Sequence, residues 1–331
     1  MKISYYFEHQ QFSAAQLAAA GRLVPVSSLP SVDGSALRRS TTGWKARSMP
    51  TFSSYDGTEL AYHLIGEGEP LICLPGGAMR ASEYLGDFGG LSAHRQLVLL
   101  DHRGTGDSPE PAEVESYRCD RVVADVEALR AHLGLEKVDL FTHSAGANLG
   151  VLYMQRHPER VARLALITPG MRAVGIRIDE GSREAATSLR KDEPWYDEAI
   201  GPFRRDWTDE GSDEDAALAG PFWYGRWDEV AQEHHATRAT QLNGDARAAH
   251  YAEGAFDPDA TKAAIAGLEI PVLILVGELD FSPSPVLATQ LSELFADGWV
   301  QLVVQPGAGH HPWLDDAAWF GDVVTRWLAE S

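Results

Sequence analysis

Short apolar runs alternate with helical stretches along much of this chain, and this alternation restricts the possible folds more than any other feature. The expected buried strands are Leu71–Leu74, Gln96–Leu100, Val138–Thr142 and Val161–Ile167. The expected helices are Cys119–Leu133, Ala145–His157 and a closing helix Trp313–Leu328. Repeated strand–helix–strand units give parallel strands with helices on both faces of the sheet. The sequence therefore predicts an α/β fold with a mostly parallel sheet flanked by helices.

The alternation stops at Thr168-Pro169-Gly170 and resumes in the buried-strand pattern of Ile270–Val276. About 90 residues lie between them, rich in Trp, Asp, Glu and Ala, with helical periods and no clear strand. A helical block at that place lies over the carboxyl edge of the sheet, where open α/β sheets bind ligands. We therefore predict a poorly ordered N-terminal extension at residues 1–48, a core at 49–170 and 262–331, and an inserted helical cap or lid at 171–261.

The composition argues against several classes of function. The formal net charge of −20 makes nucleic acid a poor partner, because a protein that binds a polyanion needs a basic face. No run of 18 apolar residues exists, so we expect no membrane insertion, and the N-terminus shows no signal-peptide pattern. Cys73 and Cys119 match no metal spacing and are expected to be reduced, which favours a cytoplasmic protein. The oligomeric state cannot be read from the sequence.

A candidate nucleophile lies in the segment Phe141-Thr142-His143-Ser144-Ala145-Gly146, between an expected strand and an expected helix. A sharp strand-to-helix turn of the Gly-x-Ser-x-Gly type exposes a serine hydroxyl, and it needs small residues two positions to either side. Thr142 and Gly146 hold those positions here, so Thr replaces the first Gly. The turn aims the helix N-terminus at Ser144, and the N–H of Ala145 would donate to a developing oxyanion.

A second glycine-containing turn, Leu74-Pro75-Gly76-Gly77-Ala78, follows the first buried strand. Glycines let the backbone turn tightly and present N–H groups to a ligand. We choose Gly77 as the second oxyanion donor.

Two further elements supply a base and an acid. Asp280 follows the resumed strand, and His310 follows the last expected strand, Val300–Val304. A serine hydroxyl needs a base within hydrogen-bond reach, and the base needs a carboxylate that fixes its tautomer. Ser144, Asp280 and His310 occur in the chain order typical of this arrangement, each after a strand. Two alternatives stay open, namely Glu278 as the acid and His311 as the base.

These motifs resemble those of the α/β-hydrolase superfamily over residues 49–170 and 262–331. Asp101-His102-Arg103-Gly104-Thr105-Gly106-Asp107-Ser108 is similar to that family's Asp-x-Arg-Gly-x-Gly-x-Ser loop, and Gly309-His310-His311-Pro312 to its catalytic-histidine segment. The resemblance implies an α/β-hydrolase fold, a Ser144–Asp280–His310 triad, and an oxyanion hole formed by the N–H groups of Gly77 and Ala145. In the Asp101 loop we expect Arg103 to be a buried ion-pair partner.

Within that superfamily the chain is similar to the proline iminopeptidase-like enzymes. Those usually carry His-Gly-Gly-Pro-Gly after the strand and Gly-Gly-Ser-Trp-Gly-Ser at the nucleophile. This chain has Pro75-Gly76-Gly77-Ala78-Met79 and Thr142-His143-Ser144-Ala145-Gly146-Ala147 instead. Both departures argue against peptidase activity and leave the triad intact.

The expected cap is rich in aromatic residues, of which some should line an apolar pocket above Ser144. The candidate substrate-binding residues are His143, Trp195, Trp207, Trp223 and Trp227. The sequence predicts a serine hydrolase that cleaves an ester or lactone of a small, fairly apolar substrate through an acyl-enzyme. The alternatives are a proline iminopeptidase-like aminopeptidase or amidase, and a non-hydrolytic acyltransferase or ligand receptor. We expect no cofactor and no metal, since Glu233-His234-His235 lacks a second ligand cluster.

Overall fold

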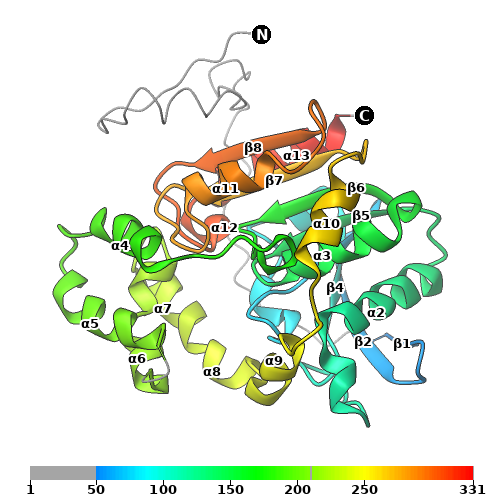
Figure 1. Cartoon of the computed structure of the whole chain (residues 1–331), viewed down its shortest axis with the longest axis horizontal. Coiled ribbons are helices and arrows are strands. Elements are labelled where there is room, and N and C mark those ends of the chain that lie inside the picture. The colour runs from blue at the N-terminus through cyan, green and yellow to red at the C-terminus, as the bar shows by residue number, and fades with distance from the viewer. Residues whose placement is uncertain (1–49, 209–210, 331) are drawn as a thin grey trace.

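The computed structural model describes residues 50–208 and 211–330, and its centre is a large sheet (Figure 1). In this described part eight strands pair in the order β1-β2-β4-β3-β5-β6-β7-β8. Their bounds are β1 Thr51–Ser53, β2 Glu59–Ile65, β3 Pro70–Leu74, β4 Gln96–Leu100, β5 Val138–His143, β6 Val161–Ile167, β7 Val272–Gly277 and β8 Val300–Gln305. The pairs β1–β2 and β2–β4 are antiparallel and the other pairs are parallel. The predicted mostly parallel sheet is confirmed.

Alternate residues of the central strands face opposite sides of the sheet. In β3, Ile72 and Leu74 pack into one hydrophobic cluster, and Leu71 and Cys73 pack into another. All four side chains are fully buried. Since successive side chains of a strand point to opposite faces, a sheet covered on both faces needs strands without a polar side. This requirement explains the unbroken apolar runs of the sequence.

Helices cover both faces of the sheet, as the sequence predicts. The first hydrophobic cluster includes side chains of α2 Cys119–His132, α3 Gly146–Arg156, α10 Pro258–Ile265 and α11 Pro285–Ser292. The second includes side chains of α12 Pro312–Asp315 and α13 Ala317–Ala329. The expected closing helix Trp313–Leu328 is divided at Asp316, because the Asp316 side chain accepts a hydrogen bond from the N–H of Trp319 and caps a new helix.

The segment between β6 and β7 is helical and extends beside the sheet (Figure 1). Its α-helices in the described residues are α4 Glu180–Ser188, α5 Tyr196–Asp206, α6 Asp213–Leu218, α7 Glu229–Ala236, α8 Arg238–Gln241, α9 Gly244–His250 and α10 Pro258–Ile265. Side-chain caps begin several of them, for example Asp179 at α4 and Ser212 at α6. Helix α10 starts inside the range predicted for the cap, but its Ile265 belongs to the core cluster. The predicted extension 1–48 lies outside the described residues.

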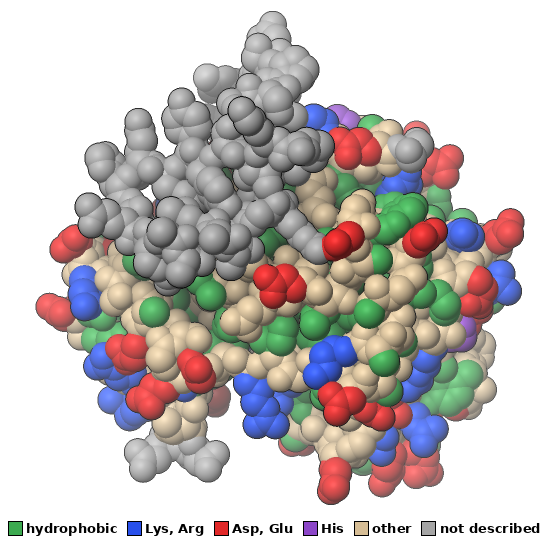
Figure 2. Space-filling view, turned by 45° about the horizontal axis from the view of Figure 1, so that its top comes forward, with side chains coloured by type: hydrophobic (Ala, Val, Ile, Leu, Met, Phe, Trp, Pro, Cys, Tyr) green, Lys and Arg blue, Asp and Glu red, His purple; other side chains and the backbone are tan. Residues whose placement is uncertain are grey.

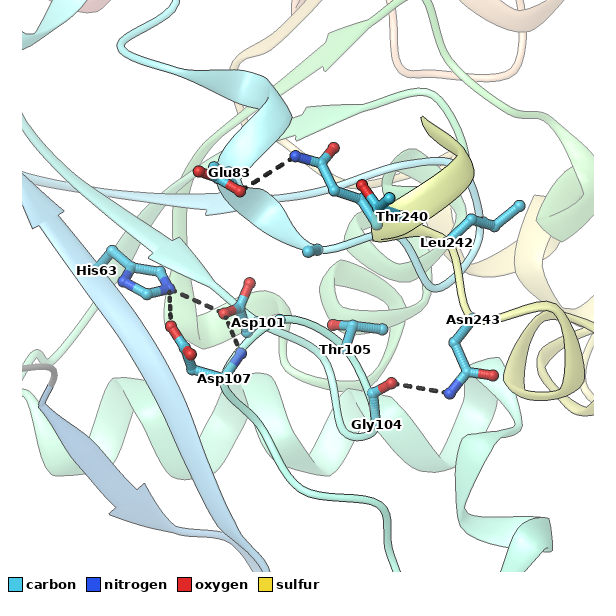
Figure 3. A pocket seen from close by; sticks show the side chains of 12 residues that line it. His63, Glu83, Asp101, Gly104, Thr105, Asp107, Thr240, Leu242 and Asn243 are labelled. Atoms are coloured by element: carbon cyan, nitrogen blue, oxygen red, sulfur yellow. Dashed lines mark hydrogen bonds and ion pairs between the residues drawn. The ribbon is translucent and has the colours of Figure 1, made fainter. Parts of the chain in front are cut away.

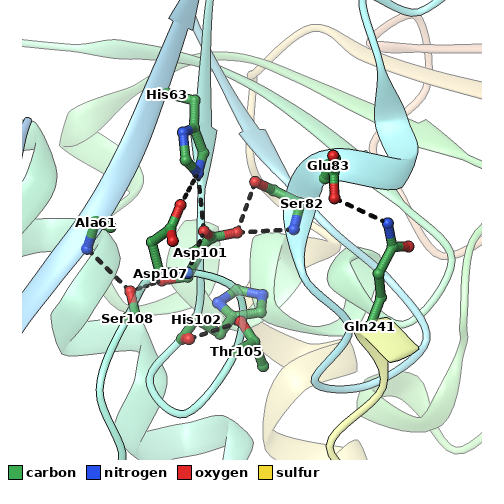
Figure 4. Close-up of polar contacts among 10 residues, drawn as sticks. All are labelled: Ala61, His63, Ser82, Glu83, Asp101, His102, Thr105, Asp107, Ser108 and Gln241. Carbon is green, nitrogen blue, oxygen red and sulfur yellow. Dashed lines mark hydrogen bonds and ion pairs between the residues drawn. The ribbon is translucent and has the colours of Figure 1, made fainter. Parts of the chain in front are cut away.

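The loop after β4 is held by buried polar contacts (Figure 4). Asp101 accepts hydrogen bonds from the N–H and the hydroxyl of Ser82 and from the N–H of Asp107. Deeper in the same loop Arg103 is fully buried and donates to both carboxylate oxygens of Asp125, which is fully buried as well. This pairing agrees with the structural role expected of Arg103.

Three observations concern the surface, the helices and the thiols. Acidic and basic side chains lie intermingled on the described part of the face that Figure 2 shows. Among the described residues, no helix combines the length and the apolar content that crossing a bilayer requires. Cys73 and Cys119 are free and buried, and burial raises the pKa of both thiols.

Candidate active site

Ser144 lies in a strained turn between β5 and α3. Its φ of +51° is in the left-handed region, which costs energy for a residue with a side chain. Tight packing enforces the turn, because a Cβ on Gly146 would come within 2.5 Å of the Leu74 carbonyl oxygen. Thr142 takes the place of the usual first glycine. Gly150 of α3 leaves room for the Thr142 methyl group, because a Cβ on Gly150 would lie only 2.7 Å from that methyl carbon.

The structure brings Ser144, His310 and Asp280 together at the carboxyl ends of β5, β8 and β7. The His310 Nε2 atom lies 2.9 Å from Ser144 Oγ, and His310 Nδ1 lies 2.9 Å from Asp280 Oδ2. The other carboxylate oxygen, Asp280 Oδ1, accepts the N–H of Ser282 at 2.8 Å. Asp280 and His310 are 1% and 2% exposed, so their contact is shielded from water. This arrangement is suited to proton transfer between a hydroxyl and an imidazole.

The two alternative residues have other partners. Glu278 Oε2 accepts the N–H of Gly307 at 2.8 Å. His311 stacks on the Tyr224 ring at 4.8 Å between centroids, and burial holds the pKa of His311 well below its usual value. His310 is therefore the histidine that contacts Ser144, and Asp280 is the carboxylate that contacts His310.

The loop after β3 lies directly against the nucleophile. A Cβ on Gly76 would meet the Ser144 Cβ at 2.6 Å and the Ala145 nitrogen at 3.2 Å. Gly77 follows with φ +68°. In the described part of the chain, the backbone N–H groups of Gly77 and Ala145 donate to no acceptor. Two free donors beside Ser144 match the requirement of an oxyanion hole.

His143, which the sequence predicts to line the substrate pocket, is placed behind the nucleophile instead. It is 2% exposed, and both of its ring nitrogens have partners inside the protein. Nδ1 lies 2.6 Å from the Tyr84 hydroxyl oxygen, and Nε2 lies 3.0 Å from the His310 carbonyl oxygen. His143 therefore contacts protein groups through both ring nitrogens, which the sequence motif alone did not reveal.

The four candidate tryptophans divide into two groups. Trp223 lies against His310, with ring centroids 4.9 Å apart. The other three pack on aromatic partners: Trp195 on Phe222 at 4.9 Å, Trp207 on Phe281 at 5.6 Å and Trp227 on Tyr224 at 5.5 Å. Sequence reasoning missed Phe281, which packs on Trp223 at 4.6 Å and is 1% exposed. Its position directly after Asp280 was the available signal.

Hydrogen bonds join the segment Trp223–Arg226 of the insertion to the loop that carries His310. The His310 N–H donates to the Trp223 carbonyl at 2.8 Å. The Asp315 carboxylate accepts N–H groups from Gly225 and Arg226 on the insertion and from Gly309 on the histidine loop. A Cβ on Gly309 would lie 2.6 Å from the Tyr224 carbonyl carbon, so the two segments are in van der Waals contact.

A polar pocket of about 580 Å³ lies between the Asp101 loop and the segment Thr240–Asn243 (Figure 3). His63 Nε2 lies there 2.8 Å from Asp101 Oδ2 and 3.7 Å from Asp107 Oδ2. Burial alone would lower the pKa of His63, but the hydrogen bond and charge of Asp101 outweigh it and raise that pKa. These three side chains are close enough to hold a metal ion. They already satisfy one another as an ion-paired group, and we assign them no ligand.

Comparisons with known proteins agree with the fold. The family described as alpha/beta hydrolase fold matches residues 69–317. A proline iminopeptidase from Lactobacillus helveticus is 34% identical over 117 residues, which are 33% of this chain and 40% of that protein. The match thus spans about two fifths of this relative. Two solved structures share the fold. An esterase from Exiguobacterium antarcticum has a TM-score of 0.65 and 18% sequence identity, and the alignment covers 85% of this chain and 99% of the esterase. An enol-lactonase from Burkholderia xenovorans LB400 has a TM-score of 0.62 and 23% identity, and the alignment covers 85% of this chain and 100% of the enol-lactonase.

Proposed function

This chain belongs to the alpha/beta hydrolase fold family, and from that premise we propose that it is a serine hydrolase acting on a carboxylic ester or lactone of a small, fairly apolar substrate. The observation that carries the proposal is the hydrogen-bonded series Ser144–His310–Asp280, with two successive distances of 2.9 Å. A receptor would need neither the base nor the acid.

The proposed mechanism has two halves. His310 Nε2 takes the proton of Ser144 Oγ as that oxygen attacks the substrate carbonyl carbon. The N–H groups of Gly77 and Ala145 stabilise the resulting oxyanion. His310 then gives its proton to the leaving oxygen, and the acyl group stays on Ser144. In the second half His310 deprotonates a water molecule, whose oxygen attacks the acyl carbon. The bond from that carbon to Ser144 Oγ then breaks, His310 returns its proton to Oγ, and the acid leaves.

The surroundings of His310 favour an apolar substrate. Trp223 and Phe281 place aromatic surface beside the imidazole. We propose that the insertion, residues 171–261, acts as a cap whose aromatic side chains contact the acyl or alcohol group, with Trp223 as its residue nearest the triad. In a lactone the alcohol stays covalently joined to the acyl group, so the substrate is compact. The aromatic surface of Trp223 and Phe281 on one side of the site suits such a substrate.

A second candidate is the removal of an N-terminal residue from a peptide. The similarity to proline iminopeptidases favours it. The departures from that group's two glycine-rich motifs count against it, because those motifs shape the backbone around the nucleophile.

One pair of substrates separates the two candidates. We expect turnover of p-nitrophenyl butyrate and little turnover of proline p-nitroanilide. Ser144→Ala should lower kcat about 10⁴-fold or more, while Ser53→Ala, an exposed serine of β1, should leave it unchanged. Near-normal turnover by folded Ser144→Ala protein would exclude the serine mechanism, and a preference for the proline amide would select the peptidase.

A further inference from the structure

Tyr84, a residue that no sequence motif singled out, makes two short contacts beside the nucleophile. It lies in the 3₁₀ turn Ser82–Leu85 and is 5% exposed. Its hydroxyl oxygen is 2.6 Å from the backbone nitrogen of Gly76 and 2.6 Å from His143 Nδ1. One hydroxyl thus joins the loop of the proposed oxyanion donor to the strand end that carries Ser144.

The direction of each hydrogen bond follows from the partners. The His310 carbonyl can only accept, so His143 Nε2 carries the hydrogen in their 3.0 Å contact. Burial, with the nearby His310 second, holds the pKa of His143 well below its usual value, so the ring is neutral and Nδ1 accepts. The Tyr84 hydroxyl therefore donates to Nδ1, and its oxygen accepts the N–H of Gly76. Burial also raises the pKa of Tyr84, which keeps the hydroxyl protonated.

The result is one continuous series of hydrogen bonds that joins the loop after β3, the end of β5 and the loop that carries His310. It runs from the N–H of Gly76 through Tyr84 and His143 to the carbonyl of His310. The insertion holds Tyr84 from the other side, because His234 of α7 donates to the Tyr84 carbonyl at 2.9 Å. The Arg80 guanidinium lies over the Tyr84 ring at 4.0 Å. Tyr84 is thus fixed at its ring, its carbonyl and its hydroxyl.

We propose that Tyr84 is a positioning residue for the hydrolysis, holding Gly77 at the oxyanion and fixing the His310 backbone through His143. The proposal rests on the proposed function. Gly77 follows Gly76 directly, so the bond to the Gly76 N–H controls the orientation of the next peptide group. Displacing a catalytic group by about 1 Å costs on the order of 10²-fold in rate. The Tyr84 hydroxyl is hydrogen-bonded to Gly76 and His143, so its effect passes through the groups that it holds.

The test removes only the hydroxyl. Tyr84→Phe should lower kcat for p-nitrophenyl butyrate about 10- to 100-fold, with KM changed less than about 3-fold. The inhibition constant of a trifluoromethyl ketone, which forms an oxyanion on the serine, should rise by a similar factor. The matched control is Tyr62→Phe, because Tyr62 is a buried tyrosine whose hydroxyl contacts His132 at 3.2 Å away from the site. That control should keep the wild-type kcat.

Labelling of Ser144 with a fluorophosphonate counts the intact sites. A wild-type kcat in folded Tyr84→Phe protein, or a loss of kcat explained wholly by fewer labelled sites, would overturn the proposal. If Tyr84→Phe does not fold, the proposal is tested by comparing His143→Leu with His143→Gln. The glutamine amide offers an acceptor for Tyr84 and a donor for the His310 carbonyl, so it should restore activity that leucine loses. Equal activity of those two variants would overturn the proposal. Failure of the proposed function itself is a different result: the wild-type protein would then hydrolyse no ester, or Ser144→Ala would retain activity.

Discussion

Replacing Asp280 with asparagine tests the proposed triad through the position of a single proton. Asp280 Oδ1 accepts the N–H of Ser282 at 2.8 Å, and Oδ2 faces His310 Nδ1 at 2.9 Å. In Asp280→Asn the amide oxygen will keep the backbone N–H, so the amide NH₂ will face Nδ1. The imidazole must then present a lone pair at Nδ1 and carry its hydrogen on Nε2. That nitrogen can no longer accept the proton of Ser144.

The expected loss is about 10⁴-fold in kcat, the size seen when a triad histidine is held in the wrong tautomer. At 1.36 kcal/mol for each factor of ten, this is about 5.4 kcal/mol of transition-state stabilisation. The assay is steady-state hydrolysis of p-nitrophenyl butyrate, with thermal unfolding as the measure of folding. Glu278→Gln is the matched control, because its carboxylate accepts the N–H of Gly307 and has no contact with His310. It should change kcat only a few-fold.

Two outcomes would refute this reasoning. A loss below about 10-fold in folded Asp280→Asn protein would mean that the carboxylate does not set the tautomer. A loss in Glu278→Gln equal to that in Asp280→Asn would transfer the acid's role to Glu278.

Three further predictions concern stability and specificity. Asp125→Asn leaves the buried guanidinium of Arg103 without its closest carboxylate and should lower the free energy of unfolding by about 3–5 kcal/mol in urea titrations; a loss under about 1 kcal/mol would contradict it. The raised pKa of His63 means that its pairing with Asp101 stabilises the fold fully below the unfolded value of 6.5 and is lost as pH rises through the folded pKa. His63→Gln should therefore destabilise more at acidic than at alkaline pH, and a difference independent of pH would be inconsistent with that ion pair. Trp223→Ala, which removes about 100 Å² of apolar contact, should weaken transition-state binding of a bulky aryl ester by about 2.5 kcal/mol, or roughly 70-fold in kcat/KM. An equal loss for an acetyl ester would show that Trp223 does not determine specificity.

The sequence predicted the core well because strand ends and their order carry much of the information. Apolar runs with residues for both faces, such as Leu71–Leu74, can be read directly as buried strands. The carboxyl ends of parallel strands meet at one edge, so residues that follow β5, β7 and β8 converge however far apart they are in the chain. This geometry is why Ser144, Asp280 and His310 were found together.

The internal supports of the site could not be predicted in the same way. Tyr84 lies in a short turn without periodicity, and its partners Gly76 and His143 come from other segments. Such contacts depend on the exact packing of three loops, to which no spacing rule applies. The position of His143 was likewise missed, since adjacency to Ser144 in the chain does not say which side of the turn a side chain occupies.

The attachment of Trp223–Arg226 to the histidine loop has a consequence for protein engineering. Exchanging the whole insertion for that of a relative would replace the segment whose Trp223 carbonyl accepts the His310 N–H, and it would also bring a new backbone against Gly309. A graft that instead ends on either side of these four residues, and retains Asp315 opposite them, keeps the base in place while the rest of the insertion is replaced. For this chain we therefore expect the exchangeable unit to be smaller than the insertion, with limits set by the hydrogen bonds of the histidine loop.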